Sequence, residues 1–152
     1  MSNILDDIDR SILSILQEDA RTPYVKIADQ LGVSDATIHI RVKKLVNKGI
    51  IKQFTVLLDE GQVGQSVTSY VLVRVEPGTI EQVCEALNKL ENVFEIYEIH
   101  ERYDLLVKVK GDSLNEFRDV LIQDMRSIPH ILSSEAYTVY KTWKQTHSVP
   151  LS

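Results

Sequence analysis

The spacing of apolar residues changes near Lys52, and this change constrains the fold of the 152-residue chain more than any other feature of its sequence. Before Lys52, apolar residues recur at the three- and four-residue spacing of amphipathic helices. After it, segments that alternate apolar and polar residues, typical of strands, mix with helical ones. We therefore predict an α+β protein, with a helical domain over residues 1–52, a linking strand and hinge over 53–66, and a mixed domain over 67–152.

The helical domain is predicted to contain three short helices that share one core. Asp6 suits the N-cap position of the first helix and Ser34 that of the third, because their side-chain oxygens accept hydrogen bonds from free backbone N–H groups. Thr22 followed by Pro23 is typical of an N-cap and the first residue of a helix, and it indicates where the second helix begins.

The junction between the second and third predicted helices has a distinctive spacing. Ala28 is small enough to let two helices approach, Gly32 permits the left-handed backbone of a tight turn, and Ile38 fills the angle between the helices. This spacing is typical of a helix-turn-helix, and we expect a domain of the winged type.

The third predicted helix concentrates positive charge in an acidic chain. From Asp35 to Lys52 the sequence contains five cations and one acid, a local charge of +4, whereas the formal net charge of the chain is -5. If Ile38 points inward, steps of about 100° per residue place a basic face outward. A basic face on a helix-turn-helix indicates binding to double-stranded DNA. The candidate contact residues are Ser34, Ala36, Thr37, His39, Ile40, Arg41, Lys43, Lys44 and Lys48.

These residues are expected to take different roles at DNA. Thr37 and Arg41 are the candidates for base edges, because the N-terminal half of a recognition helix enters the major groove and Arg binds guanine through two hydrogen bonds. Ile40 can contact a thymine methyl group, and the lysines more readily meet phosphates. His39 has two interpretations, a packed or solvated imidazole and a DNA contact. The alternative for the whole face is the ordinary solvated surface of an amphipathic helix.

The second domain is predicted to be a ferredoxin-like sandwich with the order β-α-β-β-α-β. Its helices are expected to begin after Thr79 and after Ser113, where Glu116 completes a capping box. The expected strands cover residues 67–76, 93–100, 103–110 and 131–140. A further strand-like run over residues 50–59 leads into the hinge.

Two segments of the second domain are candidates for contacts between subunits. One is a strand face that either forms a dimer surface or packs under the helices, namely Val67, Ser69, Val71, Val73 and Val75. The other is residues 143–152, a polar tail that a neighbouring subunit would order.

Composition places the chain in the cytoplasm, without a membrane partner. Its one cysteine, Cys84, excludes an intramolecular disulfide and fits a reducing compartment. The first residues, MSNILDDIDR, carry acid where a signal peptide needs base, and no apolar run approaches the roughly 18 residues of a membrane span. A pI near 5.3 argues against indiscriminate nucleic-acid binding, so any DNA contact must be local.

Three segments together resemble the Lrp/AsnC family of leucine-responsive or feast/famine regulators. They are LDDIDRSILSILQEDAR, IADQLGVSDATIHIRVKKLVNKGII and YDLLVKVKG. The resemblance implies a sequence-specific transcriptional regulator on chromosomal DNA that binds palindromic operators. It also implies a C-terminal domain that forms homodimers through its sheet, assembles further, often to octamers, and often binds an amino acid.

The resemblance also points to an effector loop at Glu101, Arg102, Tyr103 and Asp104. Family members often carry glycine at the position of Glu101, where it would let a small ligand approach the backbone closely. Arg102 either meets a ligand carboxylate or a neighbouring subunit's acid, or forms a salt bridge at the hairpin tip. For Tyr103 and Asp104 the alternatives are a core tyrosine and a solvated turn acid.

Siroheme decarboxylases resemble the same family, so an enzyme is the alternative function. The four histidines, His39, His100, His130 and His147, show no metal-ligand spacing. No nucleophile motif or glycine-rich phosphate loop occurs either. We therefore predict no catalytic residues, no metal site, no cofactor and no enzymatic activity.

Overall fold

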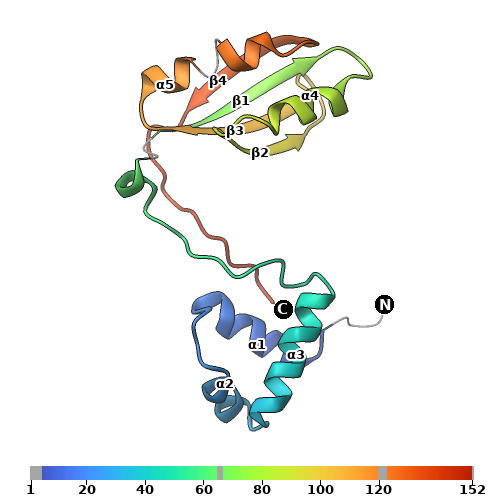
Figure 1. Cartoon of the computed structure of the whole chain (residues 1–152), viewed down its shortest axis with the longest axis vertical. Helices are drawn as coiled ribbons and strands as arrows, with labels where there is room; N and C mark the ends of the chain where they lie inside the picture. The colour runs from blue at the N-terminus through green and yellow to red at the C-terminus, as the bar shows by residue number, and fades with distance from the viewer. Residues whose placement is uncertain (1–4, 65–66, 120–122, 152) are drawn as a thin grey trace. The chain divides into compact units, whose positions relative to one another are not determined.

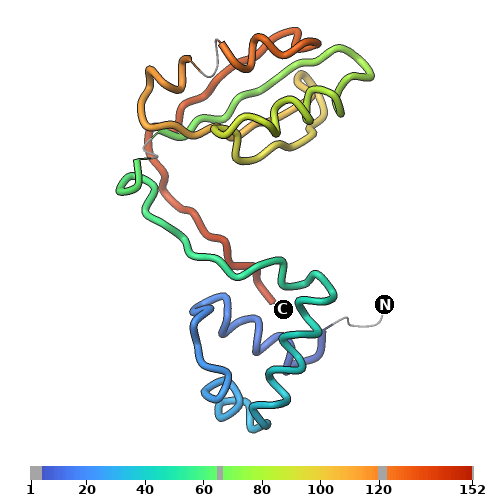
Figure 2. The backbone as a smooth tube through the Cα atoms, in the orientation of Figure 1, coloured from blue at the N-terminus to red at the C-terminus, as the bar shows by residue number. Residues whose placement is uncertain are grey.

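The computed structural model describes residues 5–64, 67–119 and 123–151, and in it the chain forms two compact units. The head consists of residues 1–57 together with 144–152, and the sheet domain consists of residues 58–143. The chain therefore passes from the head to the sheet domain and back again (Figure 2). The last residues of the chain thus group with the first ones.

Three helices form the described part of the head (Figure 1). They are α1 (Asp7–Glu18), α2 (Tyr24–Leu31) and α3 (Asp35–Asn47). Each contributes its apolar stripe to one core, as predicted. The buried core residues are Ile12, Leu13, Leu16, Ile27, Ala28, Ile38, Val42 and Leu45.

Two of the predicted helix caps are confirmed. The Asp6 carboxylate accepts a hydrogen bond of 2.8 Å from the backbone N–H of Asp9 at the start of α1. The Ser34 hydroxyl accepts one of 3.1 Å from the N–H of Thr37 at the start of α3. Each bond satisfies a backbone donor that lacks a partner within its helix.

The predicted start of α2 is wrong. Pro23 has φ -59° and ψ 137°, which is outside the helical region, and it occupies the N-cap position itself. Thr22 instead donates its hydroxyl to the carbonyl of Asp19, at 2.8 Å. Thr22 thus closes the preceding turn, and α2 begins without a side-chain cap.

The turn between α2 and α3 has the predicted geometry. Gly32 has φ +66°, a left-handed conformation that glycine adopts without strain. Ala28 and Ile38 on either side are 3% and 0% exposed. The helix-turn-helix is therefore formed by the residues that predicted it.

The sheet domain confirms the predicted β-α-β-β-α-β order. Its antiparallel strands lie in the order β2-β3-β1-β4. After a 3-10 turn, η1 (Glu60–Val63), the elements are β1 (Val67–Val75), α4 (Ile80–Leu87), β2 (Val93–Glu98), β3 (Leu105–Gly111), α5 (Leu114–Asp119), η3 (Met125–Ser127) and β4 (Ile131–Thr138).

One face of the sheet packs under the helices. Val71, Val73 and Val75 of β1 join the core with residues of β3, α4 and α5. Ser69 on the same face is also fully buried. The sequence leaves two alternatives open for this face. The dimer surface is wrong, and the packing under the helices is correct. The opposite face contains Tyr70 and Leu72.

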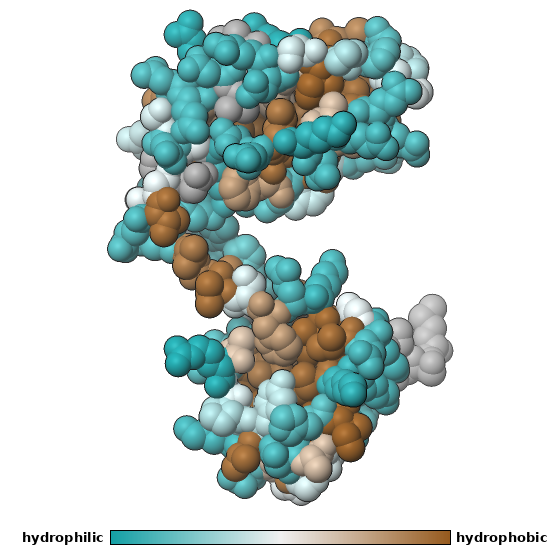
Figure 3. Space-filling model, viewed as in Figure 1, coloured by the Kyte–Doolittle hydropathy of each residue, from teal (hydrophilic) through white to brown (hydrophobic). Residues whose placement is uncertain are grey.

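The predicted strand over residues 50–59 is not formed. A strand needs a neighbour for its backbone hydrogen bonds, and no described segment pairs with this run. Ile50 and Ile51 pack against the core of the head, but the later apolar side chains are exposed, and hydrophobic surface gathers along this connection (Figure 3). They are Phe54, Val56, Leu57 and Leu58. Residues 65–66 of the predicted hinge lie outside the described residues.

Candidate nucleic-acid interface

Helix α3 buries one face and exposes the other. Ile38, Val42 and Leu45 are at most 4% exposed and fix the rotation of the helix. Ile40, by contrast, is 69% exposed although it is apolar. The other exposed side chains of the helix are those of Asp35, Ala36, His39, Lys43, Lys44, Val46 and Asn47, followed by Lys48 at the helix end.

The lysines along α3 and just beyond it form a lysine ridge, defined as Lys43, Lys44, Lys48 and Lys52. All four are exposed. In the part of the chain that the structure describes, no carboxylate lies within ion-pair distance of them. Their charges therefore remain available to phosphate groups, whose attraction to lysine does not depend on base sequence.

Hydroxyl groups occupy the N-terminal end of α3. The side-chain oxygens of Ser34 and Thr37 lie 2.8 Å apart, and the Thr37 N–H is capped by Ser34. Thr37 is half-buried. The cap therefore fixes the end of the helix that a helix-turn-helix inserts deepest into the major groove.

Contrary to the prediction, Arg41 does not face outward. Its Nη1 donates hydrogen bonds to Asp6 Oδ2, at 2.6 Å, and to Asp9 Oδ1, at 2.8 Å. The side chain is 24% exposed, and that of Asp9 only 4%. The outward orientation is thus wrong, and Arg41 connects α3 to the start of α1.

The position of Arg41 explains this contact. It follows Ile38 by three residues and precedes Leu45 by four, so it lies beside the buried stripe and not opposite it. Asp9 lies next to the stripe of α1 and supplies the partner. The sequence signal for this pair is a cation beside the apolar stripe of one helix and an acid beside the stripe of the helix that packs against it.

This cluster makes the head sensitive to acid. The Asp9 backbone N–H and, after it, the Arg41 guanidinium lower the pKa of Asp6, while the hydrogen bond to Asp6 raises the pKa of Arg41. A lowered carboxyl pKa means that the folded state binds the proton less well than the unfolded state. The stabilisation by the Asp6 charge is therefore present above the unfolded pKa, about 3.9, and is lost as the pH falls through the folded value.

We expect Asp6→Asn to remove this dependence, because asparagine keeps the cap and loses the charge. The free energy of unfolding of the native head should exceed that of the variant by a constant amount above about pH 5, and this difference should shrink below about pH 4. Denaturant unfolding from pH 3 to pH 7 measures it. Asp7→Asn, in the same helical turn, is the control, and an equal pH dependence in both variants would contradict the assignment.

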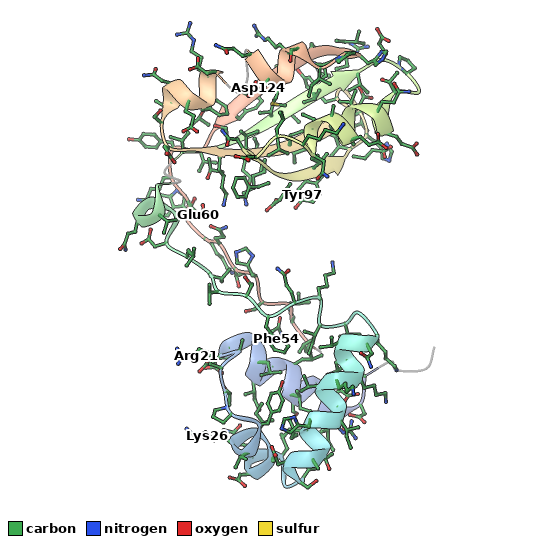
Figure 4. The ribbon with its side chains drawn as sticks, in the orientation of Figure 1. Arg21, Lys26, Phe54, Glu60, Tyr97 and Asp124 are labelled. Atoms are coloured by element: carbon green, nitrogen blue, oxygen red, sulfur yellow. The ribbon has the colours of Figure 1, made fainter. Side chains whose placement is uncertain are left out.

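His39 has one packed side and one open side. Its ring lies 4.7 Å edge-on from that of Tyr24, and its Nε2 is 3.6 Å from Asp35 Oδ2. The side chain is nevertheless 63% exposed. A groove of about 430 Å³ adjoins the His39 ring, and Phe54, which Figure 4 labels, is one of its lining residues. The groove is lined by Tyr24, His39, Ile40, Val42, Lys43, Val46 and Phe54.

One residue of the candidate effector loop, Asp104, forms hydrogen bonds with the backbone of β1. Asp104 Oδ2 accepts a 2.8 Å hydrogen bond from the N–H of Val75, next to a register irregularity between β1 and β4. The Asp104 N–H in turn donates to the Val73 carbonyl. Asp104 is therefore not the solvated turn acid of the alternative interpretation, because it closes the end of β1.

Of the other three loop residues, Arg102 and Tyr103 contact Glu135 of β4. Arg102 is 80% exposed and has Nη2 3.6 Å from Glu135 Oε1. Tyr103 is buried, and its hydrogen bond to Glu135 raises the pKa of the phenol and lowers that of the carboxyl. Glu101 has φ +105°, a conformation that favours glycine.

Each of the two units matches a known domain family. Residues 5–46 match the AsnC-type helix-turn-helix domain, and residues 68–149 match the Lrp/AsnC ligand binding domain. The chain belongs to the Lrp/AsnC family. It is a transcriptional regulator of this type, with a DNA-binding helix-turn-helix and a ligand-binding domain.

Relatives of this Lrp/AsnC protein share its full length. It is 36% identical to the HTH-type transcriptional regulator FL11 of Pyrococcus abyssi, over 97% of each chain. It is 33% identical to the transcriptional regulator AzlB of Bacillus subtilis, over 99% of this chain and 98% of that one. The structure of AsnC from E. coli superposes with a TM-score of 0.92 at 30% identity, covering 97% of this chain and 99% of the other.

The same comparisons bear on the enzyme alternative. The named relatives are transcriptional regulators, which favours regulation over siroheme chemistry for this Lrp/AsnC protein. Among the described residues, His, Cys, Asp and Glu side chains gather nowhere into a group of three or more that would bind a metal ion. None of the helices in residues 5–64, 67–119 and 123–151 has the length and apolarity of a membrane span.

Proposed function

We propose that the protein binds palindromic operators as a homodimer, with α3 of each head in the major groove. The lysine ridge carries this proposal, since it supplies unpaired cations along a helix whose opposite side is buried. Ile40 and Thr37 contact base edges, with Ser34, Ala36 and His39 beside them, and the lysines contact phosphates. Arg41 holds α3 in place.

The lysine ridge gives the test of DNA binding. We expect Lys44→Ala to weaken binding to operator and unrelated duplexes alike, and to reduce the slope of log affinity against log salt by about 1, because one phosphate contact is lost. Fluorescence anisotropy with both duplexes over a salt series measures this. Lys89→Ala, an exposed lysine of the sheet domain, should change neither quantity. A loss confined to the operator would contradict a phosphate contact.

The dimer surface is the sheet face opposite the helices. Tyr70 and Leu72 lie on it, Tyr97 is 49% exposed there (Figure 4), and Lys108 is only 7% exposed and paired with Glu95 at 2.9 Å. A second copy can cover this face without leaving the lysine charge unpaired. Sedimentation should give a dimer or a multiple of it, such as an octamer, and Tyr97→Asp should shift it toward the monomer. A monomer at high concentration would refute the dimer.

The sheet domain binds a small effector, an amino acid, at the loop that contains Glu101. Its match to the ligand binding domain supports this. Arg102 reaches solvent and meets the effector carboxylate in place of Glu135. The effector biases one assembly of dimers over another and so changes the spacing of the heads. The protein acts without cofactor or catalysis, in the cytoplasm on chromosomal DNA.

Glu101 gives the test at this loop. We expect Glu101→Gly to stabilise the sheet domain by about 1 kcal/mol, since glycine relieves the positive φ at some cost in chain entropy. Thermal unfolding measures this, and repeating it with each amino acid shows whether the variant binds one more tightly. Arg102→Gly, at the neighbouring exposed position, should instead be neutral or slightly destabilising. Equal effects of the two substitutions would mean that Glu101 stores no strain.

A further inference from the structure

The last residues of the chain contact α1. Val149 donates its backbone N–H to Gln17 Oε1 at 2.6 Å, and Gln17 Nε2 donates to the Val149 carbonyl at 3.1 Å. One carboxamide thus binds both backbone groups of a single residue, as a neighbouring strand would. The two residues are 132 positions apart in the sequence. Figure 1 shows the last described residues reaching α1.

Leu151 adds an apolar contact to this pair of hydrogen bonds. It is partly buried against the core of the head, whereas residues 141–150 are exposed. The segment is therefore held at two points, by its backbone at Val149 and by a side chain at Leu151. Val149 itself contributes little side-chain contact, because 63% of it is exposed.

We propose that residues 148–151 are a releasable clasp, and that its docking site is Gln17 with the adjoining core of the head. Two exposed hydrogen bonds and one half-buried leucine give a weak contact on their own. However, the segment and its docking site belong to the same chain, so the local concentration of the segment is in the millimolar range. A weak contact at this concentration is populated and also opens readily.

The clasp changes how the head is attached to the sheet domain. When it is closed, two chain segments connect the units, residues 53–58 and the segment after β4. When it is open, only the first connects them. A second attachment reduces the orientations available to the head, and release restores them.

Amide hydrogen exchange of the full-length protein tests the clasp without DNA. The Val149 N–H should exchange about tenfold more slowly in the native chain than in Gln17→Ala. Leu151→Asp should also accelerate the exchange. Val149→Ala is the matched control and should keep the protection at this residue, since the contact uses only backbone atoms. Equal exchange rates in the native chain and in Gln17→Ala would overturn the proposal.

A second experiment tests the consequence for DNA, and it rests on the proposed function. A chain that ends at His147 should tolerate altered half-site spacing in the operator, and the affinity penalty of a misplaced half-site should fall about tenfold. If the Val149 N–H is protected in the native chain but truncation does not change how affinity depends on half-site spacing, the clasp forms without restraining the head. That result would overturn the proposed restraint. Loss of all operator binding by the native chain would instead refute the proposed function.

Discussion

Arg41→Ala is expected to destabilise the head by about 2 to 4 kcal/mol, because it leaves the carboxylate of Asp9 buried without a partner. Asp9 is 3% exposed, so water cannot replace the guanidinium. DNA affinity at low denaturant should fall only through the unfolded fraction of heads. Denaturant unfolding, followed through the amide signals of α1 to α3, measures the loss.

The partner variant separates this effect from a direct DNA contact. Adding Asp9→Asn to Arg41→Ala should recover part of the stability, since it removes the buried charge. The salt slope of DNA binding should remain that of the native protein in the folded variants, unlike that of Lys44→Ala. Native stability in Arg41→Ala together with a loss of operator preference would show that this side chain reads bases after all.

Ile38→Ala is expected to cost about 2 to 5 kcal/mol of head stability, because it leaves a cavity where the three helices meet. Ile38 is fully buried in the core of the head. The sheet domain has a separate core, so its unfolding transition should not move. Calorimetry, or amide exchange resolved by residue, distinguishes the two transitions.

Ile40→Ala is the matched control for Ile38→Ala, two residues along the same helix. Its side chain is exposed, so stability should change by less than about 0.5 kcal/mol, whereas operator affinity should fall by about 1 kcal/mol if it meets a thymine methyl group. Equal destabilisation by both substitutions would mean that α3 is rotated from the orientation described above.

The sequence predicts features that depend on neighbours along the chain. The stripes of the three helices, the caps at Asp6 and Ser34, and the left-handed turn at Gly32 all follow from spacing within about seven residues. The β-α-β-β-α-β order follows from the alternation of such local patterns. These features hold because each residue meets the same geometric requirement in any protein with that helix or turn.

Contacts between distant segments could not be predicted in the same way. Arg41 was expected to face outward, since its charge was visible in the sequence and the acid that faces it, 32 residues earlier, was not recognised as a partner. Gln17 and Val149 likewise show nothing in the sequence that pairs them. Buried polar pairs depend on how two elements pack, and residue spacing does not determine that packing.

The two faces of the sheet show a related limit. Alternation over Val71, Val73 and Val75 predicts that these side chains share a face, but it does not say whether helices or a second subunit cover it. Which of the two covers this face depends on the side of the sheet on which α4 and α5 pack. Tyr70 and Leu72, between these valines, form the other face because the helices occupy the first.

The connection at residues 53–58 has a consequence for proteolysis. It has no regular secondary structure, and its exposed Phe54, Leu57 and Leu58 are side chains that chymotrypsin-like proteases prefer. Because each unit has its own core, a nick there severs the covalent path that leads from the DNA-binding helices to the ligand-binding sheet without unfolding either part. The helix-turn-helix and the ligand-binding domain would then each persist as a folded unit without a covalent connection between them.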